Sequence, residues 1–315
     1  MTIFLISDDA RSDTDVLDFL PAITASVNRP TANYQFLTTP QGDAVAITLT
    51  GEDPLQGTLT FEVVSDPPNG DLTGTPPNLT YSPDAEFTGK DSFSFTATNQ
   101  RGSSKPAYID IYVIDPANFL HNLMVDFGPY DSQSEHAGDF YFRINYDKVF
   151  LEFGQDVLED HQGQLKDNPA FEYLVDIDAD VVSPVNATVF RLIEQVDTQD
   201  YEIHLVPVDI NDVWLSIDHV KNPTVQENDQ VTARQVLGKP GTWDSYAGRV
   251  EIQIILTQEG KSVCPFLFFD PATRAEHENK VNQLIDDWET YKGNSEIYSE
   301  EEFPFTGCRN ATTGM

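Results

Sequence analysis

Positive charge is scarce in this sequence. Its 315 residues include 18 Lys and Arg against 52 Asp and Glu, which gives a formal net charge of −34. Nucleic acid and anionic lipid repel a chain this acidic, so we exclude both as partners. The acidity fits either solvation in a saline setting or a set of low-affinity calcium sites, and composition does not separate the two. Hydrophobic residues make up 39% and aromatic residues 11% of the chain, which is ordinary for a globular protein.

Long apolar runs are also missing. No stretch approaches the roughly 20 apolar residues that a membrane-spanning helix needs. The N-terminal residues, MTIFLISDDARSD, contain a short apolar run with no basic residue ahead of it, so they predict no secretory signal. We therefore expect an extracellular, cell-surface or virion protein that is exported by another route, starts upstream, or travels as part of a virion.

Cysteine occurs only twice. Cys264 directly follows a strand-like run, and Cys308 lies beyond a predicted helix. We predict a disulfide between them that ties down the C-terminal tail, and such a bridge favours an extracellular location. Two free thiols in a reducing compartment are the alternative. The usual sequence signs of phosphate-binding loops, of nucleophilic serine and of paired-cysteine chemistry are absent.

The stretch from residue 30 to 115 reads as an all-β module. Apolar and polar residues alternate in short runs, with turn clusters such as EDPLQG, SDPPNGD and NQRGSS between them. Alternation with a period of two and frequent turns is typical of a β-sandwich. The alternating apolar positions are Val45, Ile47, Leu49, Leu59, Phe61, Val63, Phe93, Phe95, Ile109, Ile111 and Val113.

The same stretch resembles the cadherin-like or Ig-like repeats of bacterial adhesins, most specifically in NGDLTGTPPNLTYSP. The resemblance implies a spacer or adhesion module. Repeats of this kind often carry an Asp-rich turn that can hold calcium. Here the turn runs from Asp53 to Gly57 without the later acidic residues, and calcium needs six or more oxygen ligands. A calcium site is therefore not expected in this turn.

A second strand-rich region follows Asp115, with runs such as DFYFRIN, KVFLEF, YEIHLVPV and RVEIQIIL. Near the end, Val281, Leu284, Ile285 and Trp288 recur at helical spacing and predict an amphipathic helix that ends at Gly293. We predict four segments. They are a leader or docking arm at 1–29, an Ig-like β-sandwich at 30–115, a β domain at 117–270, and a C-terminal helix with a disulfide-stapled tail at 271–315.

The β domain resembles the M23 family, the lysostaphin- and LytM-type peptidoglycan endopeptidases, over roughly residues 125–270. VQENDQVTARQVLGKPGTW is a close likeness of one conserved turn of that family, and DADVVSPVNATV is a fair likeness of its hairpin. The resemblance implies an antiparallel β-barrel or sandwich. The predicted fold class is therefore mostly β, an Ig-like sandwich followed by an M23-type domain with one C-terminal helix.

The resemblance departs at the metal ligands. On the best register the family's first His falls on Glu172 and its Asp on Asp176, whereas the strand His is retained as His219. The family's H-x-H pair falls on Arg249 and Glu251. M23 enzymes hold zinc with imidazoles and one carboxylate around an open coordination position. Exchanging imidazoles for carboxylates favours a hard cation over zinc and makes any metal-bound water less acidic.

Three readings of these positions stay open. The strand GRVEIQIIL can simply be half-exposed, with Arg249 and Glu251 on its polar face. Arg249 can instead place its guanidinium where the family holds its metal, paired with Glu172 and Asp176. In the third reading Glu172, Asp176 and Glu251 bind calcium or manganese. A rival pair, His136 and Asp139, has spacing one residue short of the family motif and predicts only a surface loop.

We therefore predict a non-catalytic surface or virion-associated protein. Its binding groove would comprise Glu172, Asp176, His219, Arg249 and Glu251, with no cofactor. Its partners would be a cell-wall glycan or peptide, or neighbouring surface or virion proteins. The alternative is a peptidoglycan endopeptidase with a carboxylate-rich metal site, in which His219 would be catalytic.

Overall fold

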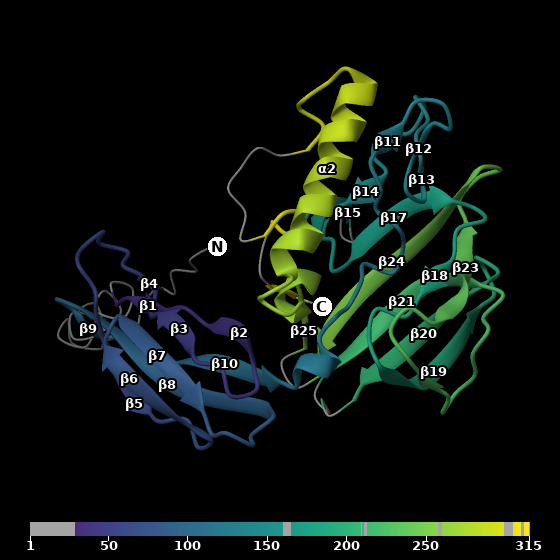
Figure 1. Cartoon of the computed structure of the whole chain (residues 1–315). Coiled ribbons are helices and arrows are strands. Elements are labelled where there is room, and N and C mark those ends of the chain that lie inside the picture. Colours follow the sequence, from purple (N-terminus) through teal and green to yellow (C-terminus); the bar gives the residue numbers. More distant parts are fainter. Residues whose placement is uncertain are drawn as a thin grey trace, which may run out of the picture. The chain divides into compact units, whose positions relative to one another are not determined.

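The computed structural model describes residues 29–159, 165–208, 210, 213–257, 260–298, 305–309 and 312–314. The predicted leader or docking arm therefore lies outside the described residues, except for its last residue. Packing divides the chain into two compact units (Figure 1). One comprises residues up to 35 with 44–84 and 91–110, and the other comprises 36–43, 85–90 and 111–315.

The Ig-like module contains two antiparallel sheets. The first has the strand order β2-β10-β8-β5, with β9 beside β8, and the second has the order β3-β7-β6. A short pair, β1 with β4, completes the module. The strands are β1 (Thr31–Ala32), β2 (Gln35–Pro40), β3 (Val45–Thr48), β4 (Gly51–Glu52), β5 (Thr60–Ser65), β6 (Gly70–Thr75), β7 (Asn78–Pro83), β8 (Gly89–Asn99), β9 (Gly102–Ser103) and β10 (Ala107–Ile114).

The alternation seen in the sequence places one face of each sheet in the core. Ile47 and Tyr81 of the second sheet are buried, as are Phe93 and Phe95 of the first. The buried hydroxyl of Tyr81 donates a hydrogen bond to Asp91 at 2.7 Å, so it has the partner that a buried polar group needs. The predicted all-β module is therefore confirmed.

The turn at Asp53 uses its carboxylate for the backbone. The Leu55 and Gly57 amides donate to Asp53 at 3.0 and 2.9 Å, and the Asn99 side chain donates at 2.8 Å. These hydrogen bonds, the Leu55 amide first, lower the pKa of Asp53. The carboxylate that a calcium-binding repeat would offer to the ion here stabilises the turn itself.

The second unit is organised around one large antiparallel sheet with the order β14-β17-β24-β23-β21-β20-β19-β22. Among the strands that the structure describes the path is open, because β14 and β22 are its ends and do not pair with each other, so the predicted barrel is not closed there. The strands on this path are β14 (Phe150–Leu151), β17 (Phe171–Asp176), β19 (Ala187–Gln195), β20 (Asp200–Pro207), β21 (Val213–Lys221), β22 (Gln230–Val231), β23 (Val236–Thr242) and β24 (Ala247–Leu256).

Short strands pair with interior strands of this sheet. β18 pairs with β23, and β25 lies between β24 and β26. Separate small sheets are formed by β11, β12 and β13 and by β15 and β16. Their bounds are η1 (Pro116–Asn118), β11 (Tyr130–Asp131), β12 (His136–Ala137), β13 (Phe140–Tyr141), β15 (Asp156–Glu159), β16 (Leu165–Asp167), β18 (Val181–Val182), β25 (Lys261–Val263), η2 (Pro265–Phe268) and β26 (Thr312–Gly314).

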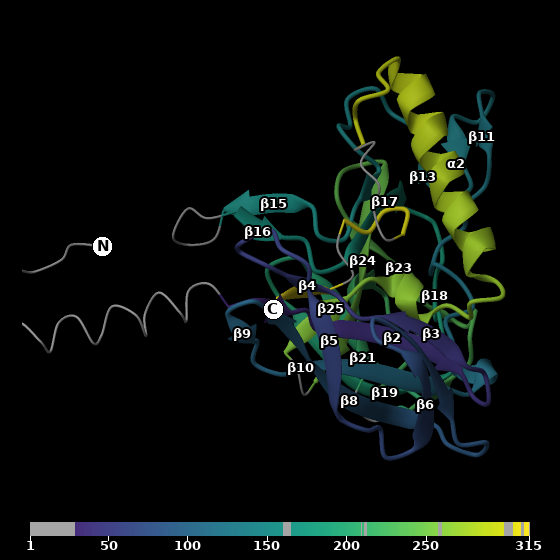
Figure 2. The same ribbon diagram turned by 90° about the vertical axis from the view of Figure 1, so that its left-hand side faces the viewer.

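The predicted C-terminal helix is confirmed as α2 (Arg274–Lys292), the only α-helix within the described residues. Gly293 ends it in the left-handed conformation, and its amide donates to carbonyls of the last turn. Val281, Leu284 and Trp288 are buried. Figures 1 and 2 show α2 beside the β14–β17 end of the large sheet, where the Trp288 ring meets Phe142 edge-on at 4.9 Å.

The predicted disulfide between Cys264 and Cys308 is present, and both cysteines are fully buried. Backbone hydrogen bonds join Phe153 to Gly307 and Arg309 to Phe153, so the tail around Cys308 returns to the sheet. No helix among the described residues is long and apolar enough to cross a membrane.

The disulfide gives the first testable prediction. It closes a loop across 44 residues of sequence, and the chain-entropy model assigns such a loop about 4 kcal/mol. Cys308→Ser should therefore lower the free energy of unfolding by about that amount in urea denaturation under non-reducing conditions. Thiol titration of denatured, unreduced protein should find no free thiol, and two titratable thiols would contradict the bridge.

Candidate functional site

Carboxylates from three adjacent strands meet on one face of the large sheet. Glu172 of β17 lies opposite Glu251 of β24, and Glu251 lies opposite Asp218 of β21. Side chains directly opposite on neighbouring strands are about 5 Å apart, so three like charges are crowded together. We call Glu172, Asp218, His219, Arg249 and Glu251 the sheet-face cluster.

Arg249 supplies the permanent positive charge of this cluster. Its Nε lies 2.8 Å from Oε1 of Glu172, and its Nη2 donates a hydrogen bond to Glu251. The Arg249 side chain is 31% exposed, whereas those of Glu172 and Glu251 are only 11% and 17% exposed. One guanidinium therefore bridges two largely buried carboxylates on adjacent strands.

The positive charge only partly relieves the carboxylates. Burial raises the pKa of Glu172 to about 7, repulsion from Glu251 adds to the rise, and Arg249 and His219 oppose it. Burial also raises the pKa of Glu251, against the attraction of Arg249. Burial raises the pKa of Asp218 as well. Near neutral pH the cluster therefore holds fewer negative charges than its composition suggests.

His219 enters the cluster through a break in the strand pairing. Its φ of +58° is unusual for a residue other than glycine and falls where β21 leaves β24 and begins to pair with β23. Nδ1 of His219 lies 2.9 Å from Oδ2 of Asp200, and Nε2 lies 3.7 Å from Glu251. The ring therefore lies between two carboxylates, at a residue with left-handed backbone conformation.

Gly241 makes room for this arrangement. A Cβ at that position would lie 2.6 Å from Oδ2 of Asp200 and 3.0 Å from Cβ of His219. No side chain fits there without moving the histidine or its partner. The small residue at this position of β23 therefore has a direct structural role next to the cluster.

A second polar group lies next to the cluster on the same sheet. His204 Nε2 lies 2.7 Å from Glu202, and the Ser216 hydroxyl donates to the same carboxylate at 2.5 Å. The hydrogen bond with His204 is the largest cause that lowers the pKa of Glu202. Sequence reasoning missed Asp200, Asp218 and this group, although alternation along β20 and β21 could have placed them on the polar face.

Asp176 does not join the sheet-face cluster, so the predicted convergence of Glu172, Asp176, Arg249 and Glu251 is wrong for this residue. β17 pairs with β24 without interruption from Phe171 to Asp176. Four residues of extended strand separate the Cα atoms of Glu172 and Asp176 by on the order of 13 Å. Asp176 instead lies 3.0 Å from Nε2 of His136, at the other end of the strand.

His136 and Asp139, the pair expected to form a surface loop, make different contacts. His136 belongs to β12 and stacks on Tyr141 with ring centroids 4.6 Å apart. Asp139 accepts a hydrogen bond from the Asp126 amide at 2.7 Å. The two side chains therefore serve different contacts, and His136 is part of a short strand rather than a loop.

The cluster does not fit the zinc that the sequence resemblance implies. Arg249 brings a permanent cation to the two glutamates, and His219 is the only imidazole in the cluster. Among the described residues no three His, Cys, Asp or Glu side chains are arranged to hold a metal ion. The alternative ligand set of Glu172, Asp176 and Glu251 is not assembled either, because Asp176 is too far along the strand.

Residues 27–112 match the family model of a bacterial Ig domain, which confirms the predicted Ig-like module. No curated protein matches the chain. Similar solved structures include the antimicrobial peptidase lysostaphin from Staphylococcus simulans, at 18% identity and a TM-score of 0.31. That alignment covers 44% of this chain, and the chain spans only about half of lysostaphin, 52%.

Two further structures are similar. The catalytic domain of the prophage-encoded M23 protein EnpA from Enterococcus faecalis has 14% identity, a TM-score of 0.29, and coverage of 44% of this chain and 95% of that one. A putative M23 peptidase from Pseudomonas aeruginosa has 12% identity, a TM-score of 0.29, and coverage of 76% and 95%. Likenesses at these scores transfer no ligand, residue role or activity to this chain.

Glu172 gives a pH dependence of stability with a definite sign. Its pKa is about 7 in the folded chain against an ordinary value of 4.5. Between those values the folded state keeps a proton that the unfolded state has released, so this contribution is complete below pH 4.5 and is lost as pH rises through 7.

We therefore compare the wild type with Glu172→Gln, which cannot ionise, by urea denaturation at several pH values. Between about pH 4.5 and 8 the wild type should lose on the order of 3 kcal/mol of unfolding free energy relative to the variant. Glu194→Gln, an exposed position on β19, is the control and should run parallel to the wild type. Parallel curves for Glu172→Gln would show that Glu172 ionises normally.

Proposed function

We propose that this protein is a non-catalytic, surface-associated binding protein in which an Ig-like spacer carries a β domain with a charge-compensated site. The observation that carries the proposal is the position of Arg249, whose guanidinium contacts both Glu172 and Glu251. Glu172, Arg249 and Glu251 occupy the positions where the sequence resemblance to M23 peptidases would place the family's first His and its H-x-H pair.

Hydrolysis by a zinc enzyme needs a metal with one coordination position open to water, so that the bound water becomes acidic. A guanidinium has no such position and cannot lose its proton under physiological conditions. It supplies positive charge and fixed hydrogen-bond donors, and these hold carboxylates in place. The arrangement therefore supports a site that binds a ligand but does not hydrolyse it.

One observation favours the alternative of a hydrolase. Asp200 and His219 are 2.9 Å apart, and an acid–imidazole pair of this kind orients a general base in many enzymes. Nε2 of His219, however, faces the carboxylates of Glu251 and Asp218, at 3.7 and 3.9 Å. The pair on its own therefore favours a fixed imidazole over catalysis.

Exposed aromatic residues near the far end of β17 suit a binding role. Trp243 and Tyr246, in the turn between β23 and β24, are each 52% exposed. The Ile177 amide donates to the Tyr246 carbonyl at 3.2 Å, which ties this turn to the end of β17. Aromatic rings of this kind supply contact area for glycans and peptides. A cell-wall glycan, a cell-wall peptide, or a neighbouring surface or virion protein is the partner we propose, in an extracellular setting.

Removing Arg249 tests the proposal. Arg249→Ala leaves two largely buried glutamates facing each other, and we expect a loss of about 2 kcal/mol of unfolding free energy, between the values for surface and buried pairs. Lys239→Ala is the matched control, because it removes one ion pair, with Asp180 at 2.8 Å, whose side chains are well exposed. It should cost less than about 0.5 kcal/mol.

Thermal melts with and without calcium, manganese or zinc separate the alternatives. The proposal expects a wild-type melting temperature that does not respond to these ions. A hard-metal hydrolase predicts a large rise with the ion that is lost in Glu251→Gln, because a ligand that binds only the folded state stabilises it. Such a rise would contradict the proposal.

A further inference from the structure

Basic side chains, scarce in the whole chain, gather in one pocket of the second unit. The pocket has a volume of about 430 Å³ and lies beside α2 and residues 121–127. Arg234, His277 and Lys280 line it together with His121. Burial lowers the pKa of His277, and the positive charge of Lys280 is the next cause, with smaller effects from Arg234 and His121. These side chains are therefore close enough to repel one another.

Acidic residues line the same pocket. They are Asp126, Asp139 and Asp180. Burial raises the pKa of Asp139, and repulsion from Asp126, Asp180 and Asp176 adds to it, whereas the Asp126 amide opposes the rise through its hydrogen bond. No basic residue figures among these causes. The acidic group is therefore crowded with charge of its own sign, as the basic group is.

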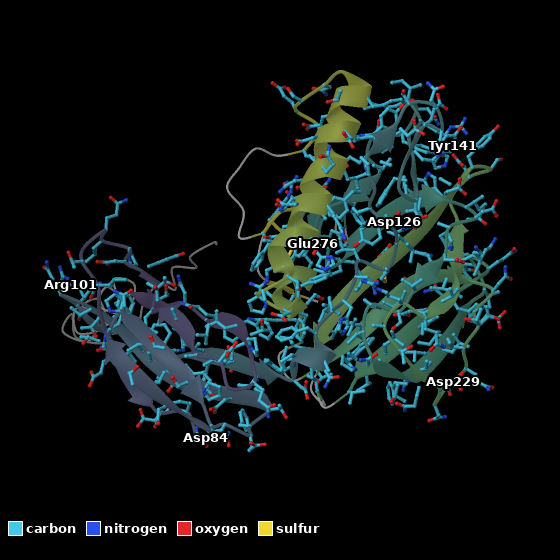
Figure 3. The ribbon with its side chains drawn as sticks, in the orientation of Figure 1. Asp84, Arg101, Asp126, Tyr141, Asp229 and Glu276 are labelled. Carbon is cyan, nitrogen blue, oxygen red and sulfur yellow. A yellow bond between two sulfur atoms is a disulfide. The ribbon has the colours of Figure 1, made fainter. Side chains whose placement is uncertain are left out.

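The two groups do not neutralise each other. Within the described part of the chain no ion pair joins Asp126, Asp139 or Asp180 to Arg234 or His277. Lys280 pairs instead with Glu276 on its own helix, at 3.3 Å. Figure 3 labels Glu276 on α2 and Asp126 on the chain beside it. Asp180 pairs with Lys239, at 2.8 Å, so within the described residues Asp126, Asp139, Arg234 and His277 are lining residues that no ion pair neutralises. A ligand that carries both signs can compensate these charges.

The backbone at the pocket is strained at two of its lining residues. Met124 has a φ of +71° and Arg234 a φ of +70°, and neither is a glycine. Both residues form backbone hydrogen bonds with the segment 182–183. The Val182 amide donates to the Met124 carbonyl, and the Arg234 amide donates to the Ser183 carbonyl. Unfavourable backbone conformations of this kind persist where surrounding contacts impose them and are concentrated at binding sites.

We propose that this pocket binds a short zwitterionic peptide, one with a free amino group and a free carboxylate. Arg234, supported by His277 and Lys280, would pair with the carboxylate through its planar guanidinium. The Asp139 and Asp126 carboxylates would accept hydrogen bonds from the ammonium group. A simple anion would gain only the contacts with the basic residues, and the acidic residues would repel it.

The remaining lining suits such a ligand. Leu123, Val125 and Phe127 are buried apolar residues that line the pocket and can contact small side chains. The volume lies within the range of sites for small organic ligands, which includes short peptides. The proposal does not depend on the sheet-face cluster, whose five residues are absent from this lining.

Trialanine is the probe, with its N-acetylated and C-amidated forms as matched controls. Isothermal titration with the full chain should give a Kd near 1 mM for free trialanine, and each blocked form should bind at least roughly tenfold more weakly. Arg234→Ala should weaken binding of free trialanine by at least roughly tenfold but should hardly change the affinity of the C-amidated form. Arg191→Ala, exposed on β19, should bind like the wild type.

Asp139→Asn would test the acidic group, but Asp139 also accepts the hydrogen bond of the Asp126 amide, and the substitution can disturb that turn. Lys280→Ala therefore serves as the second variant. It should reduce affinity for free trialanine while its thermal melt stays unchanged. Equal binding of the free and blocked peptides would overturn the proposal. So would inorganic phosphate that binds as tightly as trialanine, or the absence of any heat at about 10 mM peptide. Arg249→Ala should leave peptide binding intact, so that failure here is distinguishable from failure of the proposed function.

Discussion

The ion pairs of Arg249 with Glu172 and Glu251 are the interaction on which the second unit's site depends. Glu172 and Glu251 lie opposite each other on adjacent antiparallel strands, and Asp218 lies opposite Glu251 on its other side. Three carboxylates on one sheet face repel one another, and a register shift by one residue would move them all to the apolar face. The guanidinium offsets this repulsion. Burial also raises the pKa of both glutamates, which reduces their negative charge.

The extreme acidity of the chain is thus handled differently in different places. At the turn of the Ig-like module, Asp53 is satisfied by backbone amides. On the large sheet, Arg249 compensates Glu172 and Glu251 directly. In the pocket beside α2, the basic and acidic lining residues form no ion pair with each other within the described part of the chain. A charge-compensated site is stable without a ligand, whereas a charge-separated one offers binding energy to a ligand.

The sequence predicted most of the fold because burial follows short-range patterns. Alternation in GRVEIQIIL placed Val250 and Ile252 in the core and Arg249 and Glu251 on the polar face, as β24 shows. Helical spacing predicted α2, and the two cysteines predicted the bridge. The family register also named four side chains that the structure brings together: Glu172, His219, Arg249 and Glu251.

The rest could not be predicted, because it depends on strand geometry and on contacts distant in sequence. Asp176 was expected beside Glu172, but β17 pairs with β24 without interruption and places the two residues four positions apart along the strand. Asp200 reaches His219 only because β21 changes partners at a left-handed residue, which no pattern announces. The pocket beside α2 combines Arg234 with residues more than 40 positions away, and nothing in the local sequence links them.

The most direct test of the central claim is a double-mutant cycle between Arg249→Ala and Glu251→Gln, measured by urea denaturation in the presence of a chelator. If the guanidinium compensates this carboxylate, the two changes should be non-additive, with a coupling energy of about 1–3 kcal/mol that favours the wild-type pair. Effects that add to within about 0.3 kcal/mol would contradict the account, because Arg249 and Glu251 would then contribute independently.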